Sequence, residues 1–139
     1  MTYLLNYHKF QQTLKRLEIR YHEYLEHQKE LPLYLLEAMR ESCIQRFEVC
    51  FDTLWKHLKK YLETQEGLTD VPGSPNGVFK KAFVAHVIED AEPWIYFNQQ
   101  RCATSHDYNQ LKADEAFNVI ARFLPEAIKL YERMSHQPW

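Results

Sequence analysis

The stretch YLLEAMRESCIQRFEVCFDTLWKHLKKYLETQE, residues 34–66, decides the fold of this chain. Its apolar residues recur at steps of three and four, which is the period of one face of an α-helix. One stripe consists of Leu36, Met39, Cys43, Phe47, Cys50, Leu54 and Leu58, and a second consists of Ile44, Phe51, Trp55 and Leu62. Two stripes predict a helix buried on more than one side. It is either the central helix of the domain or a helix shared between the core and a second subunit.

The segments on either side of this helix carry their own signals. Upstream, a stripe of Tyr3, Tyr7, Phe10, Leu14, Leu17, Tyr21 and Tyr24 predicts a long amphipathic helix. Proline disfavours helix in the residue before it, so Leu31-Pro32 should end that helix. Downstream, all three glycines and two prolines fall within residues 67–77, which predicts one long connection.

Three further helices are expected after residue 73. Ser74-Pro75 is a typical helix start, and Phe79, Phe83 and Val87 should face inward. A short helix opens at Glu92-Pro93 with Trp94 and Phe97 inward, and the last helix covers about residues 112–134. Pro125 should kink or split that last helix. No strand-like alternation of useful length occurs, so we predict one all-α domain, residues 1–139, of about five helices.

Composition excludes several classes of protein. With 139 residues, 45% hydrophobic and 26% charged, the chain should fold without disulfides or metals. We expect no membrane span, because no run of about 18 apolar residues occurs, and the lack of a leader-like start predicts the cytosol. Cys43, Cys50 and Cys102 lack zinc-site spacing, so no metal or other cofactor is expected. The net charge of −2 argues against a strongly basic protein that binds nucleic acids indiscriminately, and no DNA partner is expected.

A local basic cleft is still compatible with this charge. Five lysines lie close enough in sequence to form one: Lys56, Lys59, Lys60, Lys80 and Lys81. The more ordinary interpretation is that they cover the solvated faces of two helices. Glycine-rich phosphate loops, HExxH and nucleophile-elbow motifs are all missing from the sequence.

The run RCATSHDY, residues 101–108, is the main functional candidate. Histidine can exchange a proton near neutral pH, and arginine offers a planar fork to phosphate oxygens. Arg101 should lie in the last turn of its helix with His106 just beyond it. Five helical residues would turn the two side chains about 140° apart, so they converge only if the chain turns near Thr104-Ser105. Tyr108 could stack on a base. Alternatively, the pair merely caps the helix or binds carboxylates.

The sequence resembles the HEPN proteins known as nucleotidyltransferase substrate-binding proteins. The resemblance is carried by QRFEVCFDTLWKHLKKYLE, residues 45–63, by Ser74-Pro75, by the Trp94 helix and by the Arg-x4-His-x-Tyr ending. It covers about residues 36–134. It implies an antiparallel bundle with a four-helix core that forms a homodimer, and a separate minimal nucleotidyltransferase as partner in a toxin–antitoxin-type module.

The resemblance leaves two functions open. In the first, a cleft with Arg101, His106, Tyr108 and Lys56 binds a nucleotide, RNA or the partner without chemistry. In the second, the chain is a metal-independent ribonuclease in which Arg101 stabilises the phosphorane and His106 moves protons. Relatives of this family commonly carry Asp before the arginine and Asn after it, whereas this chain has Gln100 and Cys102. In the ribonuclease case, Tyr108 could receive a nucleotide from the partner, which would silence the enzyme.

Overall fold

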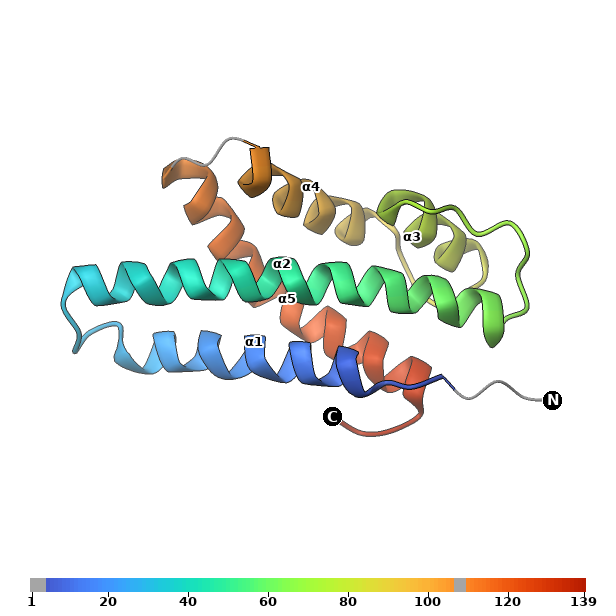
Figure 1. Cartoon of the computed structure of the whole chain (residues 1–139), viewed down its shortest axis with the longest axis horizontal. Coiled ribbons are helices and arrows are strands. Elements are labelled where there is room, and N and C mark those ends of the chain that lie inside the picture. Colours follow the sequence, from blue (N-terminus) through green and yellow to red (C-terminus); the bar gives the residue numbers. More distant parts are fainter. Residues whose placement is uncertain (1–4, 107–109) are drawn as a thin grey trace.

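The long central helix forms as α2, which spans Leu33–Thr64 and contacts each of the other four helices. The computed structural model describes residues 5–106 and 110–139, with the side chains of all of these except 104–106 and 110. Both apolar stripes are used, because Cys43, Phe47 and Leu54 of the first and Phe51 and Leu62 of the second are fully buried. Within one copy, α2 is therefore the central helix of the domain (Figure 1), and its sharing with a second subunit stays a prediction.

Four helices pack around α2. They are α1 (His8–His27), α3 (Pro75–Val84), α4 (Glu92–His106) and α5 (Gln110–Ser135). In Figure 1, α1 and α2 lie side by side and antiparallel, α3 and α4 follow the opposite edge of α2, and α5 runs diagonally behind it. The described residues contain no strand. The prediction of an all-α helical bundle is therefore confirmed.

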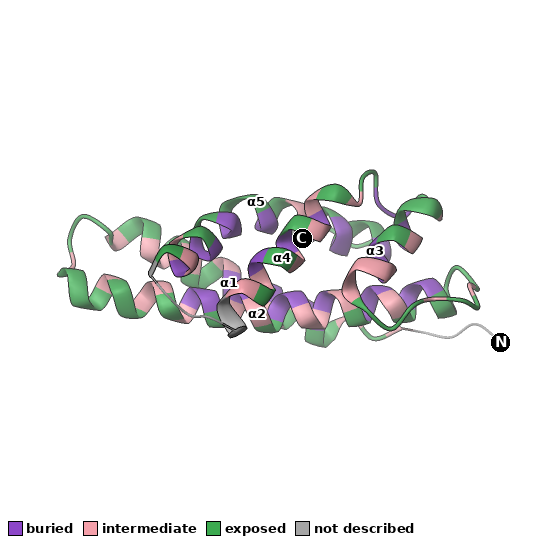
Figure 2. Cartoon of the chain, turned by 90° about the horizontal axis from the view of Figure 1, so that it is seen from above, coloured by how far each residue is buried: buried purple, intermediate pink, exposed green. Residues whose placement is uncertain are grey.

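Phe123 of α5 is the centre of the aromatic core. Its ring centroid lies 5.0 Å from that of Phe47 on α2 and 5.4 Å from that of Phe97 on α4. Trp94 lies 6.3 Å away, with its ring nearly perpendicular to that of Phe123. Such edge-to-face pairs stabilise beyond the area that they bury. Phe123 thus joins α2, α4 and α5, and Figure 2 shows the buried residues where these helices face one another.

The end of α3 differs from the prediction at one residue. Phe83 is 48% exposed, because the buried face of α3 is made by Val78, Phe79 and Ala82. Just past the helix, His86 adopts a left-handed backbone with φ of 63°. The amide of His86 donates to Phe83 O and that of Val87 donates to Ala82 O, which is the Schellman pattern. The turn aims Val87 back into the core, so Val87 is buried as expected although it lies outside the helix.

The start of the chain corrects one expectation, and both ends pack onto the helices. Helix α1 begins only at His8, one residue after Tyr7, whose hydroxyl donates to Met134 O at 2.9 Å. Tyr3, the first residue of the predicted stripe, lies outside the described residues. At the other end of the chain, the Trp139 indole donates to the Glu18 carboxylate at 3.1 Å. The tail therefore packs back along α1 (Figure 1).

Pro125 does not split α5. The helix runs unbroken from Gln110 to Ser135 with Pro125 inside it. Phe123 and Leu124 before the proline and Ala127 after it are all buried. Because burial of apolar side chains on both sides of the proline stabilises the helix, it can offset the roughly 3 kcal/mol that an interior proline costs.

Candidate functional site

Arg101 of α4 is held by two carboxylates of α2. Its Nε donates to Asp52 Oδ1 at 3.3 Å and its Nη2 donates to Asp52 Oδ2 at 3.0 Å. Glu48, one helical turn before Asp52, approaches Nη1 at 3.7 Å. This is a two-point, fork-like pair, which fixes the plane of the guanidinium as well as its position. Arg101 therefore links α4 to α2, and it does so by binding carboxylates, as the more ordinary interpretation of this arginine expected.

The environment of Arg101 favours its charged form. Hydrogen bonding to Asp52 is the main cause that raises the pKa of Arg101, against the opposing effect of partial burial. The Arg101 side chain is 22% exposed, so the charge lies at the edge of the surface and not in the core. The guanidinium is therefore charged, oriented by Asp52 and close to the surface.

The residues on either side of Arg101 point elsewhere. Gln100 is buried, and its Oε1 has no hydrogen-bond partner among the described residues. Cys102 is exposed, and its thiol lies 3.7 Å from Asn98 Oδ1, one turn earlier on α4. Asn98 in turn donates to Asn76 of α3 at 3.1 Å. Gln100 therefore faces the core and Cys102 faces the α3 side, while Arg101 faces Asp52.

The structure corrects the expected position of His106. Helix α4 continues through His106, so the chain does not turn at Thr104-Ser105 as the convergence of the pair required. Five residues of continuous helix place Arg101 and His106 about 140° apart around the axis. The two positions therefore lie on different faces of α4 within one copy of the chain. The His106 side chain and the whole of Tyr108 lie outside the described residues, and their roles stay predictions.

Lys56 lies four residues after Asp52 on α2, and so on the same face of the helix. Both Asp52 and Lys56 line a hollow of about 640 Å³ between the start of α1 and α2, which we call the α1–α2 hollow. Its lining also includes Asn6, Lys9, His57 and Lys60. Lys59, by contrast, donates to Glu63 at 2.8 Å. The predicted group of five lysines is therefore divided, and only Lys56 and Lys60 of that group belong to this hollow.

His57 forms part of the inner wall of the α1–α2 hollow. Its side chain packs against Tyr7, with ring centroids 4.6 Å apart, and against Phe10 at 5.5 Å. The residue is only 8% exposed, and its Nε2 has no hydrogen-bond partner within the described part of the chain. Burial, assisted by the positive charge of Lys60, lowers the pKa of His57 to about 4. The imidazole is therefore neutral at physiological pH.

This lowered pKa predicts a loss of stability in mild acid. Unfolded His57 takes up a proton near pH 6.5, whereas the native state resists protonation until the pH approaches about 4. Between these values the unfolded state binds more protons, so the free energy of unfolding falls as the pH falls. At pH 5 the contribution lost is about 2 kcal/mol. Urea unfolding of the wild type and of His57→Leu at pH 7 and pH 5 should show that the variant loses about 2 kcal/mol less.

A control separates this effect from the general titration of carboxylates. His22 is exposed on α1, and His22→Leu should retain the pH dependence of the wild type. Equal slopes of stability against pH for the wild type and His57→Leu would contradict a buried neutral imidazole.

Several functional candidates lay beyond the reach of sequence reasoning. Glu48 and Asp52 are spaced four residues apart, but only the packing of α4 on α2 brings them to Arg101. Lys9 joins Lys56 only because α1 starts beside the second half of α2. The part of the chain that the structure describes contains no cluster of three or more His, Cys, Asp or Glu suited to a metal ion. Nor does any described helix have the length and apolar character to span a membrane.

Comparisons with known proteins place the chain in a family. The family model described as "Nucleotidyltransferase substrate binding protein like" matches residues 5–136. A Haemophilus influenzae protein named "Probable ribonuclease HepT" is 28% identical over 105 residues, which cover 74% of this chain and 72% of that protein.

Solved structures agree on the fold. A Haemophilus influenzae protein, described as showing the fold of a substrate-binding domain of a nucleotidyltransferase, superimposes with a TM-score of 0.83 at 24% identity and covers 94% of this chain and 99% of its own. A Thermus thermophilus crystal structure gives a TM-score of 0.68 at 29% identity over 91% and 96% of the two chains. The family model and the shared helical fold thus agree, and the chain belongs to the family of nucleotidyltransferase substrate-binding proteins.

Proposed function

We propose that the chain is the substrate-binding subunit of a two-component module and binds phosphate groups of a nucleotide or RNA. The observation that carries this proposal is the α2–α4 contact, where Asp52 orients Arg101 while Lys56 lies one turn away on the same face of α2. Charge-assisted hydrogen bonds from arginine to phosphate are among the stronger polar interactions in proteins. In this arrangement Asp52 fixes the geometry of Arg101 and Lys56 adds positive charge.

The family supports a protein partner as well as a ligand. The description of the Haemophilus structure as a substrate-binding domain implies a nucleotidyltransferase with which such a domain acts. The proposed partner of this chain is therefore a separate minimal nucleotidyltransferase, within a toxin–antitoxin-type module in the cytosol. The resemblance also implies a homodimer, which is part of this proposal.

We expect Arg101→Ala to weaken nucleotide or RNA binding at least tenfold. The loss of one charge-assisted contact is worth about 1.5–3 kcal/mol, which corresponds to roughly 10- to 150-fold in affinity. The measurement is fluorescence anisotropy with a labelled oligoribonucleotide and, separately, a labelled nucleoside triphosphate at moderate salt. Arg101→Lys should fall between alanine and the wild type, because lysine keeps the charge but loses the two-point geometry.

A matched control removes the same charge elsewhere. Arg20 on α1 pairs with Glu23 on its own helix, and its side chain is 48% exposed. Arg20→Ala should leave affinity within about twofold, because it changes the net charge equally without touching the α2–α4 face. If Arg20→Ala and Arg101→Ala weaken binding to the same extent, the effect is general electrostatics and the site is not at Arg101.

The second candidate function is a metal-independent ribonuclease. It is favoured by the Arg-x4-His spacing on α4 and by the relative named a probable ribonuclease. The pair of Arg101 with Asp52 is compatible with this function, since a group that stabilises a phosphorane must be held in a fixed position. Binding and cleavage use the same face, so the two candidates differ in chemistry and not in location.

A further inference from the structure

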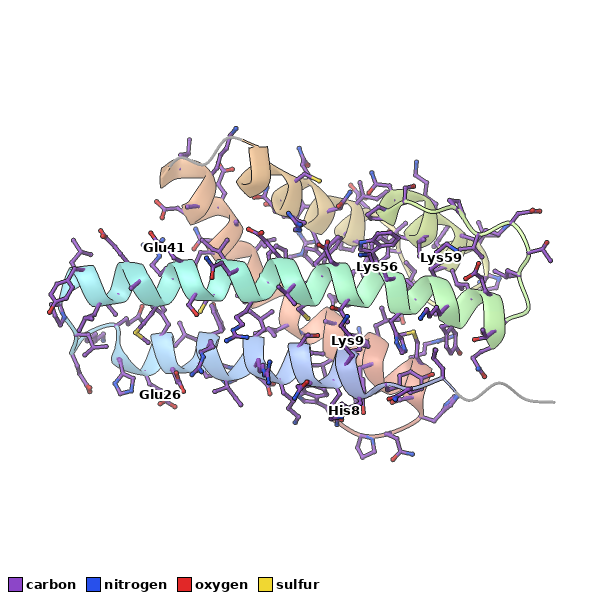
Figure 3. The ribbon with its side chains drawn as sticks, viewed as in Figure 1. His8, Lys9, Glu26, Glu41, Lys56 and Lys59 are labelled. Carbon is purple, nitrogen blue, oxygen red and sulfur yellow. The ribbon has the colours of Figure 1, made fainter. Side chains whose placement is uncertain are left out.

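The α1–α2 hollow is lined by three lysines and by one carboxylate, Asp52, which pairs with Arg101. Among the described residues, no carboxylate forms an ion pair with Lys9, Lys56 or Lys60. Figure 3 shows Lys9 on the α2 side of α1, next to the length of α2 that bears Lys56. Lysines that repel one another around a hollow raise the local positive potential and attract anions.

The start of α1 adds to this potential. The first turn of α1 contains no acidic side chain, and Tyr7 at the N-cap makes no side-chain cap bond. Asn6 Oδ1 accepts the His8 amide at 2.8 Å, and Asn6 itself lines the hollow. The amino end of a helix carries a partial positive charge that favours anions. The start of α1, Lys9 and the two α2 lysines therefore all make the electrostatic potential of the hollow more positive.

One buried part of the wall of the hollow, the His57 ring, is neutral at physiological pH. His57 is buried there, and Lys60 is the one charged group that contributes to lowering its pKa. The field of Lys60 thus reaches the wall of the hollow. A buried, neutral ring beside these lysines lowers the local dielectric and so strengthens their attraction for an anion.

We propose that the α1–α2 hollow is a second phosphate-binding site, in which Lys9, Lys56 and Lys60 hold phosphate groups of an RNA strand or a nucleotide. The inference rests on the proposed function for the class of ligand. It adds Lys9, Lys60 and the start of α1, which the α2–α4 contact does not include. Asp52 lines the hollow and also bonds Arg101, so the two sites adjoin. An RNA strand can therefore cross from one site to the other.

The test uses the double variant Lys9→Ala/Lys60→Ala in the full chain. Both lysines are exposed, so the variant is expected to fold. The probes are a labelled single-stranded RNA of about 12 nucleotides and a labelled nucleoside triphosphate, with affinity measured from about 50 to 300 mM salt. We expect RNA affinity to fall at least tenfold at about 0.1 M salt, and the slope of log K against log salt to shrink by about 1.4.

The matched control is Lys29→Ala/Lys80→Ala, which removes the same charge from the α1–α2 connection and from α3. It should weaken binding less than threefold and leave the slope nearly unchanged. A second readout is the NMR signal of the His57 ring, which should shift when RNA is added to the wild type but not to the Lys9/Lys60 variant.

Parallel measurement of Arg101→Ala separates this inference from the proposed function. If Arg101→Ala weakens binding and the Lys9/Lys60 variant behaves like its control, the hollow is not a phosphate site and the proposed function stands. If only the Lys9/Lys60 variant weakens binding, the hollow is the phosphate site and the proposal that Arg101 binds phosphate is wrong. If neither variant affects either probe, both proposals are overturned.

The two probes distinguish the source of the phosphate. A loss confined to RNA assigns the hollow to the backbone of a strand, since only a strand supplies phosphates across both sites. A loss of similar size for the nucleoside triphosphate assigns it to the phosphate tail of a nucleotide. Each of these results supports the site and names its ligand.

Discussion

Phe123→Ala is expected to lower the free energy of unfolding by about 3–5 kcal/mol, the usual cost of removing a fully buried phenylalanine. Phe123 is 0% exposed, and its ring meets aromatic rings from both α2 and α4. Truncation removes the apolar area of the ring and leaves a cavity that its rigid neighbours cannot fill. Domains of this size are stabilised by about 5–15 kcal/mol in total, so much of the stability would be lost.

Urea unfolding at pH 7 measures this effect, and the chain offers a matched control. Phe83 on α3 is 48% exposed, and Phe83→Ala makes the same chemical change outside the core. We expect it to cost less than about 1 kcal/mol, because much of its ring area is already in contact with water. Similar losses for the two variants would contradict the central position of Phe123.

The same variant tests how the site depends on the core. Asp52 lies on α2 and Arg101 on α4, and Phe123 packs between these two helices from α5. If Phe123→Ala remains folded at low temperature, the α2–α4 contact should loosen and ligand affinity should fall. The aromatic core therefore serves the site by setting the distance between two helices.

Most of the fold could be predicted from periodicity, because burial in a helical bundle leaves a stripe on each helix. The two stripes of α2 identified the central helix, and Trp94 and Phe97 identified the buried face of α4. The errors occur where local rules compete with tertiary packing. Pro125 was expected to kink or split α5, and the split does not occur, because buried neighbours on both sides keep the helix continuous.

The site was less predictable, because ion pairs between helices depend on packing that no single stretch encodes. Arg101 was identified from its chemistry, whereas its partner Asp52 lies 49 residues away in sequence. His106 was expected beyond a turn, but α4 has no glycine or proline between Arg101 and His106 to end it, and the helix continues. Lys9 and His57 gave no functional signal, since a lysine at a helix start and a histidine on an apolar face are both common in structural roles.

His106→Ala is expected to reduce RNA cleavage by about 10²- to 10⁴-fold if the chain is a ribonuclease, which is the usual contribution of a general acid or base. In the proposed reaction the ribose 2′-oxygen attacks the adjacent phosphorus and the 5′-oxygen leaves, with a proton removed from the first and delivered to the second. The assay is cleavage of a structured RNA by purified protein in excess EDTA. His22→Ala, at an exposed position on α1, is the control and should retain full activity. Cleavage that persists in His106→Ala would trace the activity to another residue or to a contaminating nuclease.

The course of α4 adds a sharper form of this prediction. The resemblance to HEPN ribonucleases implies a site built from both copies of a dimer, and we propose that it combines Arg101 of one copy with His106 of the other. The separation of about 140° between the two positions on one continuous helix is compatible with this. Arg101→Ala and His106→Ala should each be inactive alone, and mixing them should restore part of the activity, because a mixed dimer contains one intact pair. Restoration would establish both the dimer and the shared site. If the two variants stay inactive after subunit exchange, the whole site lies within one copy. If the wild-type protein itself does not cleave RNA, binding remains the proposed function of this face.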